Sequence, residues 1–176
     1  MGRAQVRTAV QSAIQAAALP YVGTVYPARP LIADENAYTQ TMNGMATAES
    51  PNGSACIVVV NIPDDDRTRY ADVGRASVAD WWKHRVALEL WFACTGGSGV
   101  AAQEDYDTVA DALVVFIRGN PTMTAPATVW SAGEYTYGVK HAQSAAYTNA
   151  DGTTVFINGL VRFEAWEQAV GAAGAV

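Results

Sequence analysis

Hydrophobic side chains recur at helical spacing in two segments of the chain, residues 5–18 and residues 105–121. In the first segment the apolar positions are Val6, Val10, Ile14 and Ala17. In the second segment they are Tyr106, Val109, Ala110, Leu113, Phe116 and Ile117. Pro20 and Pro121 follow the two patterns, and Gly119 is placed to adopt a left-handed cap conformation. Both patterns predict amphipathic helices that bury one face against a core.

Alternating or β-branched runs predict strands in the rest of the chain. The predicted strands are residues 21–26, 55–62, 82–94, 128–139, 142–148 and 153–168. In the third strand one face carries Val86, Leu88, Leu90 and Phe92, and the other carries Arg85, Ala87, Glu89 and Trp91. In the last strand Val161, Phe163 and Ala165 share one face. Asp151 and Gly152 between the last two strands predict a hairpin turn.

The segments between these elements are predicted to be connections. Residues 33–54 are polar and rich in Gly, Asn and Thr, so they predict a long loop that orders only on contact with a neighbouring protein. Residues 64–77 predict a charged loop, and residues 95–99 predict a flexible turn. Residues 169–176 predict a flexible tail.

The order of elements is helix, three strands, helix, three strands, without an internal repeat. This order predicts a single α+β domain over residues 1–176. We expect a mostly antiparallel sheet of about five to six strands with two helices packed against it.

Charge and length narrow the classes of function. The formal net charge is −6, which makes a general electrostatic grip on nucleic acid unexpected, because such binders concentrate Lys and Arg. No apolar run approaches the ~20 residues that span a bilayer, and the N-terminus lacks the continuous apolar core of a signal peptide. Cys56 and Cys94 sit in apolar runs and predict two buried free thiols in a chain made in a reducing cytosol.

Few residue patterns in the chain could support catalysis or metal binding. The glycine-rich segment 95–99 lacks the Lys and Ser/Thr of a phosphate-binding loop. His84 and His141 are the only histidines, and neither belongs to a cluster with metal-ligand spacing, so each is predicted to be structural or exposed. A catalytic use of either one with an Asp remains the enzyme alternative.

Two further features stand out from this background. Asp64, Asp65 and Asp66 form the densest acidic cluster; a solvated loop, an acidic functional surface and a hard-cation site are the three interpretations. Trp81, Trp82 and Trp91 predict a subunit or partner interface, because tryptophan is enriched at protein interfaces. For Trp91 the cover is either a helix of this chain or another chain.

The order of elements resembles that of the tail terminator proteins of long-tailed bacteriophages, which cap the tail tube beneath the head. The resemblance spans residues 6–168. It rests on the first helix leading into "LPYVGTVYPARP", the core strand "HRVALELWFAC", the helix "EDYDTVADALVVFIRGNP" and the closing strand "GLVRFEAWEQ". Head-completion proteins, other neck connectors and tail tube-like proteins have similar small domains and remain the nearest alternatives.

The resemblance implies a hexameric ring of this chain in the virion, at the junction of tail and neck, after assembly in the host cytoplasm. It implies contacts with the major tail tube protein and with a head–neck connector, no membrane, no enzyme activity and no cofactor. DNA would slide through the ring without specific binding. On this model Asp64, Asp65 and Asp66 are predicted to line the channel, because an acidic wall repels phosphates. A small enzyme and a monomeric binding module remain the alternatives from other classes.

Overall fold

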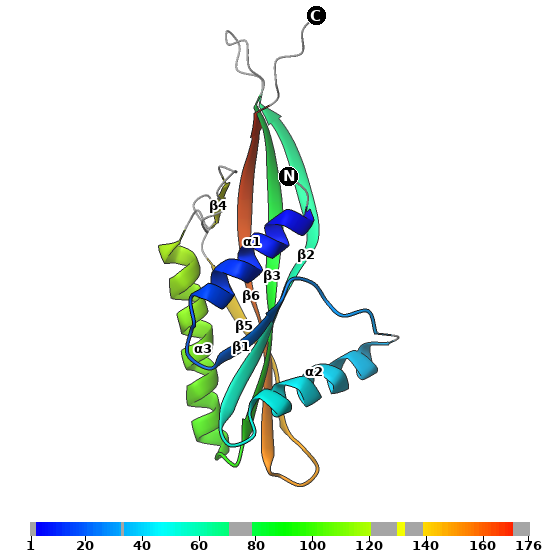
Figure 1. The fold of residues 1–176 in the computed structure, drawn as a ribbon, viewed down its shortest axis with the longest axis vertical. Helices are drawn as coiled ribbons and strands as arrows, with labels where there is room; N and C mark the ends of the chain where they lie inside the picture. Colours follow the sequence, from blue (N-terminus) through cyan, green and yellow to red (C-terminus); the bar gives the residue numbers. More distant parts are fainter. Residues whose placement is uncertain (1–2, 33, 71–78, 121–129, 133–138, 171–176) are drawn as a thin grey trace, which may run out of the picture.

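The computed structural model describes residues 3–32, 34–70, 79–120, 130–132 and 139–170. Over these residues the chain forms one six-stranded sheet with three helices (Figure 1). The helices are α1 (Arg3–Ala16), α2 (Glu35–Glu49) and α3 (Gly99–Gly119). The strands are β1 (Val22–Tyr26), β2 (Ser54–Tyr70), β3 (Ala79–Thr95), β4 (Trp130–Ala132), β5 (Lys140–Thr148) and β6 (Thr154–Val170).

The sheet has the order β1-β2-β3-β6-β4, and β5 also pairs with β6. Only the β1–β2 pair is parallel; the other pairs are antiparallel. The predicted α+β class and the mostly antiparallel sheet are therefore confirmed. The hairpin predicted at Asp151 and Gly152 is also present, since Gly152 has a φ of 67° and the turn joins β5 to β6.

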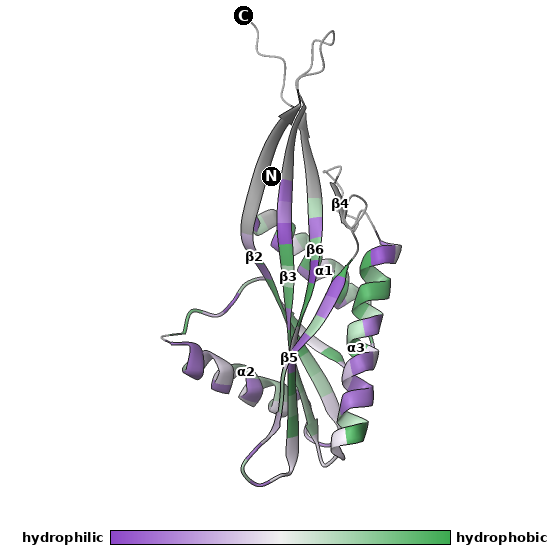
Figure 2. Cartoon of the chain, turned by 180° about the vertical axis from the view of Figure 1, so that it is seen from behind, coloured by the Kyte–Doolittle hydropathy of each residue, from purple (hydrophilic) through white to green (hydrophobic). Residues whose placement is uncertain are grey.

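The alternation along β3 separates two clusters of buried side chains. Val86, Leu88, Leu90 and Phe92 belong to the larger cluster, which also contains the buried faces of α1 and α3. Trp91 and Ala93 belong to a smaller cluster that α2 completes with Tyr38, Met42 and Ala46. The two faces predicted for β3 are thus confirmed, and each is covered by helices of the same chain. Figure 2 shows hydrophilic and hydrophobic residues alternating along α2 and α3, as helices with one buried face require.

The prediction of a loop over residues 33–54 is wrong, because Glu35–Glu49 forms α2. Asp34 is the N-cap, and its carboxylate accepts a hydrogen bond from the amide of Ala37 at 2.7 Å. The buried residues Tyr38, Met42 and Ala46 recur at intervals of four, so they form a stripe only one residue wide. Mostly polar residues and Gly44 occupy the positions between them, so the sequence shows no wide apolar stripe from which a helix would be predicted.

Helix α3 begins six residues earlier than its apolar stripe predicted. Ser98 is the N-cap, and its hydroxyl accepts a hydrogen bond from the amide of Ala101 at 3.2 Å. At the other end Gly119 is the last helical residue and does not have a positive φ. Asn120 is the C-cap instead, and its amide donates to the carbonyl of Phe116 at 2.8 Å. The side chain of Asn120 therefore satisfies a carbonyl group at the helix end.

The charged loop predicted over residues 64–77 is wrong for residues 64–70, which continue β2, and the rest lies outside the described residues. Asp64, Asp65 and Asp66 are register partners of Arg85, His84 and Lys83 in β3. Asp64 and Asp66 are thus opposite the basic residues Arg85 and Lys83; opposite charges at facing positions favour strand pairing, and this pairing is not visible in a local pattern. The predicted tail is likewise wrong for residues 169–170, which end β6, and residues 171–176 lie outside the described part. Of the strand predicted at 128–139, only Trp130–Ala132 is described as β4.

Candidate functional site

The ends of the long strands form the surface that brings the predicted site residues together. We define the sheet arm as residues 60–70 of β2, 79–88 of β3 and 161–170 of β6, together with β4. Figure 1 shows β2, β3 and β6 continuing beyond all three helices at this end of the sheet. Strand pairing extends from the Val60–Leu88 and Leu88–Val161 pairs to the Tyr70–Ala79 and Ala79–Val170 pairs, with one register shift in β2 between Asn61 and Asp64.

Four of the five tryptophans of the chain lie on the sheet arm. Trp81 is the register partner of Thr68 and Gln168, and Trp82 is that of Arg67 and Glu167. On the far side of β6, Glu167 is also paired with Trp130. Trp166 is paired with Lys83, one position along. The sequence pattern drew attention to Trp81 and Trp82 but gave no reason to associate them with Trp130 and Trp166, because strand register alone joins the four.

The predicted acidic cluster lies on the same arm as the tryptophans. Asp66 is the register partner of Lys83 in the β2–β3 strand pair, and the next residue of β2, Arg67, is the register partner of Trp82. On β3 the ammonium group of Lys83 also forms an ion pair with Glu164 of β6 at 3.0 Å. Across the arm as a whole, six acidic and five basic residues nearly balance. The arm is thus close to neutral, although Asp64–Asp66 is the densest acidic run in the chain.

Trp91, the third tryptophan of the predicted interface, lies away from the arm. Its side chain is 7% exposed and meets the ring of Tyr38 edge-on, with centroids 5.3 Å apart and planes at 87°. Helix α2 therefore supplies the cover that the sequence left open between a helix and another chain. The prediction of Trp91 as an open interface residue is corrected accordingly.

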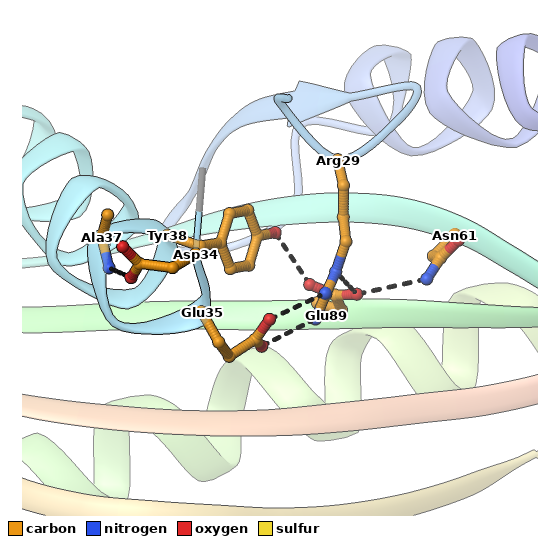
Figure 3. Close-up of polar contacts among 7 residues, drawn as sticks. All are labelled: Arg29, Asp34, Glu35, Ala37, Tyr38, Asn61 and Glu89. Atoms are coloured by element: carbon orange, nitrogen blue, oxygen red, sulfur yellow. Dashed lines mark hydrogen bonds and ion pairs between the residues drawn. The ribbon is translucent and has the colours of Figure 1, made fainter. Parts of the chain in front are cut away.

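A buried polar cluster surrounds Glu89 (Figure 3), and no local sequence pattern predicts it. The Nε of Arg29 donates to one carboxylate oxygen of Glu89 at 2.6 Å, and the hydroxyl of Tyr38 donates to the other at 2.9 Å. The amide of Asn61 donates to the first oxygen at 3.4 Å. In the sequence Glu89 is only a polar position on the mixed face of a strand, and its partners come from three separate segments of the chain.

The geometry of this cluster suits attachment of α2 better than chemistry. The guanidinium of Arg29 lies 4.5 Å from the centre of the Tyr38 ring, where a cation–π interaction adds to the ion pair. Burial raises the pKa of Tyr38, and the charge of Glu89 raises it further. The phenol therefore remains a hydrogen-bond donor at neutral pH. A buried carboxylate with three donors ties the segment before α2, the helix itself and the sheet together.

The structure places the two histidines on different strands. His84 is buried on β3, whereas His141 lies at the exposed β5 and its Nε2 is 2.8 Å from the hydroxyl of Tyr106. Burial raises the pKa of Tyr106, so this hydroxyl is a poor nucleophile at neutral pH. The contact ties β5 to α3.

The two cysteines and the glycines of segment 95–99 contribute to the core and to a turn. Cys56 and Cys94 are free and buried, as predicted, and burial raises the pKa of Cys56 to about 12. In the segment 95–99, Gly96 has a φ of 77° and Ser98 caps α3, so the glycines form the turn between β3 and the helix.

Among the described residues, no group of three or more His, Cys, Asp or Glu side chains is arranged to hold a metal ion. No helix in the described part is long and apolar enough to cross a bilayer. No protein-family model matches the sequence, and no curated protein shows significant similarity to it.

Proposed function

We propose that this chain is a structural ring component that caps the tail tube of a long-tailed bacteriophage at its head-proximal end. The proposal starts from the resemblance in element order to the tail terminator proteins. The core strand and the helix that follows it, on which that resemblance rests, correspond to β3 and α3. Helix α2 is an addition to the expected order.

The observation that carries the proposal is the sheet arm. Its outer end continues past the helices, and Asp64–Asp66, Trp81 and Trp82 lie on two of its paired strands. An enzyme places polar groups around a concavity, whereas a ring subunit needs a projecting surface that a neighbour can cover. Tryptophan is the residue most enriched among the anchors of such interfaces.

The nearly balanced charge of the arm is compatible with a channel surface along which DNA slides. Each phosphate that a cationic surface neutralises releases counterions, so a basic wall would hold the DNA. The arm has a nearly balanced charge, and the remainder of the chain supplies most of the net charge of −6. We place Asp64–Asp66 at the channel, with the arm tryptophans in contacts with the neighbouring copy or with the tube.

The experiment is removal of the gene from the phage that encodes it, followed by electron microscopy of the lysate. Because an uncapped tube end can still accept subunits, we expect tubes of uncontrolled length that are not joined to heads. A plasmid-borne wild-type chain and the variant His141→Gln should both restore normal tails. A double variant Trp81→Ser, Trp82→Ser that stays folded should not.

Other outcomes of the same experiment would contradict the proposal. Tails of normal length that fail to join heads would assign the chain to the neck connectors. Absence of tubes altogether would assign it to the tube itself. Intact, infectious phage would remove the structural role and favour an enzyme or a binding module.

A further inference from the structure

The two edges of the sheet are treated differently by the rest of the chain. At the β1 edge, the carboxamide of Gln15 donates to the carbonyl of Gly23 at 3.1 Å and accepts from the amide of Val25 at 2.9 Å. One residue of a parallel neighbouring strand would make the same two hydrogen bonds, to the carbonyl of residue i−1 and from the amide of residue i+1. Gln15 therefore occupies the place of a further strand.

A second side chain binds the same strand on its other side, because the Thr24 amide points opposite to the Gly23 carbonyl and the Val25 amide. The carboxylate of Glu49, at the end of α2, accepts a hydrogen bond from the amide of Thr24 at 2.9 Å and another from its hydroxyl at 2.5 Å. Three consecutive residues of β1 thus have backbone groups bound by side chains of α1 and α2. Proteins block the outer side of edge strands, as Gln15 does here, to prevent pairing with another chain.

The β5 edge has no such protection in the described part of the chain. Its contacts with helices involve side chains: His141 with Tyr106 of α3, and Tyr147 with Asn43 of α2. These contacts fix β5 from both faces of the sheet but leave its outer backbone groups free to pair. Lys140 is its only charged residue apart from the histidine, and small residues fill its centre, so the strand lacks the charges that usually defend an edge.

A second open edge lies on β2. Strand β1 pairs with β2 only between Cys56 and Val59, so the outer side of residues 60–70 has no strand partner among the described residues. This open edge belongs to the sheet arm, at the opposite side of the sheet from β5. In the described part of the chain, β5 and residues 60–70 of β2 thus each present an open edge, and each occupies only part of its side of the sheet.

The two open edges match each other in direction. Because β2, β3, β6 and β5 are antiparallel in succession, β5 runs opposite to β2. A second copy in the same orientation would therefore place its β2 antiparallel to β5 of the first. All copies then point the same way, as a ring with one rotation axis requires.

The open edges also differ in level along the strands. β5 lies beside residues 155–162 of β6, whereas the open part of β2 lies level with residues 161–170. Pairing the two edges shifts each copy along the strands by roughly 20–25 Å relative to the last, at about 3.3 Å per residue. Strands in such an assembly are inclined to the ring axis, as they are in other closed sheets.

We propose that copies of this chain associate by pairing β5 of one copy with residues 60–70 of β2 in the next, as antiparallel strands. The inference rests on the proposed ring and names the interface that closes it. The occupant is a second copy because, in copies that point the same way, the open edge of β2 runs antiparallel to β5. A head-to-tail contact through β1 is blocked by Gln15.

Cysteine cross-linking tests the interface in the purified full-length chain. Ala142→Cys in β5 is combined in turn with Asp66→Cys, Arg67→Cys or Thr68→Cys in β2. Under mild oxidation at least one double variant should give a ladder of covalent multimers, at least tenfold stronger than either of its single variants. The native thiols do not interfere, because Cys56 and Cys94 are buried. The matched control combines Ala142→Cys with Thr24→Cys at the blocked edge and should give no ladder.

Amide hydrogen exchange of the wild-type chain is a second test, and it requires no substitution. Amide hydrogen exchange in β5 should slow at least tenfold when the chain assembles, while exchange in β1 should be unchanged. Dimers from Ala142→Cys alone would overturn the proposal in favour of a twofold contact. A ladder from the β1 control, no ladder from any β2 pair, or unchanged exchange in β5 would also overturn it.

These results are separable from those on the proposed function. If gene removal gives overlong tubes but β5 and β2 do not cross-link, the interface is wrong and the capping role stands. If the ladder forms but gene removal leaves the tails normal, the interface is right and the capping role is wrong.

Discussion

At the scale of single residues, the structure depends on a few polar groups placed inside apolar surroundings. Glu89 is 6% exposed and accepts hydrogen bonds from Arg29, Tyr38 and Asn61. Gly159 lies where an added methyl group would collide with the hydroxyl of Tyr106 and approach the carbonyl oxygen of Ala142 to 2.9 Å. Neither role is visible in the sequence, because each depends on residues far away along the chain.

We expect Glu89→Ala to destabilise the chain by about 2–4 kcal/mol, since it leaves Arg29 and Tyr38 without their acceptor. The lower part of this range reflects the partial exposure of Arg29, whose side chain is 42% accessible. Urea unfolding followed by tryptophan fluorescence measures the change, because Trp91 packs on Tyr38. Tyr38→Phe removes only one donor and should cost about 1 kcal/mol. Equal stability of Glu89→Ala and wild type would contradict the structural role of the cluster.

We expect Gly159→Ala to cost about 1–3 kcal/mol, because the methyl group overpacks the site beneath Tyr106. Part of this loss should disappear in the background Tyr106→Phe, where the colliding hydroxyl is absent. A double-mutant cycle with thermal unfolding measures the coupling, which we expect to be at least ~0.5 kcal/mol. Additive effects of the two substitutions would mean that the hydroxyl does not lie against Gly159.

At the scale of elements, hydrophobic periodicity predicted the strands and two of the three helices. Wide apolar stripes such as that of α3, and strict alternation such as that of β3, are strong local signals. Helix α2 was missed because its buried stripe is narrow, and its N-cap Asp34 looked like one more polar loop residue. The outer part of β2 was missed because its pairing with β3 depends on register rather than on local hydrophobicity.

The prediction at this scale concerns the N-cap of helix α2. We expect Asp34→Ala to destabilise the chain by ~1 kcal/mol, because the amide of Ala37 loses its acceptor. Asp34→Asn retains an N-cap oxygen and should cost little. Limited proteolysis gives an independent readout: residues 35–49 should be protected in the isolated wild-type chain and cut faster in Asp34→Ala. Rapid cleavage of α2 in the wild type would instead support the loop predicted from sequence.

At the scale of the whole molecule, the long strands of the sheet continue past the helices and form the outer end of the sheet arm. The composition of the arm was available in the sequence, but its assembly was not. Local patterns drew attention to Asp64–Asp66 and to Trp81 and Trp82 as separate features, and strand pairing placed them together with Trp130 and Trp166. The same pairing left open edges on β5 and on the outer part of β2.

The charge of the arm gives the prediction for DNA passage. We expect the triple variant Asp64→Asn, Asp65→Asn, Asp66→Asn to slow DNA ejection from otherwise normal virions, because it leaves the arm with excess positive charge. Asparagine is preferable to lysine here, since three lysines would face Arg85, His84 and Lys83 across the strand pair. The control converts Glu104, Asp107 and Asp111, which are exposed on α3, to their amides and should leave the rate unchanged. Equal rates in the two variants would remove Asp64–Asp66 from the channel.

The central claim is that this chain forms the ring at the end of the tail tube, and a cryo-electron microscopy reconstruction of the head–tail junction tests it most directly. We predict one ring of this chain between the last ring of tube protein and the neck connector, with the β2 segment that carries Asp64–Asp66 bordering the channel. A reconstruction that places the chain elsewhere in the particle, or in which no density at the junction fits its six-stranded sheet and three helices, would contradict the account.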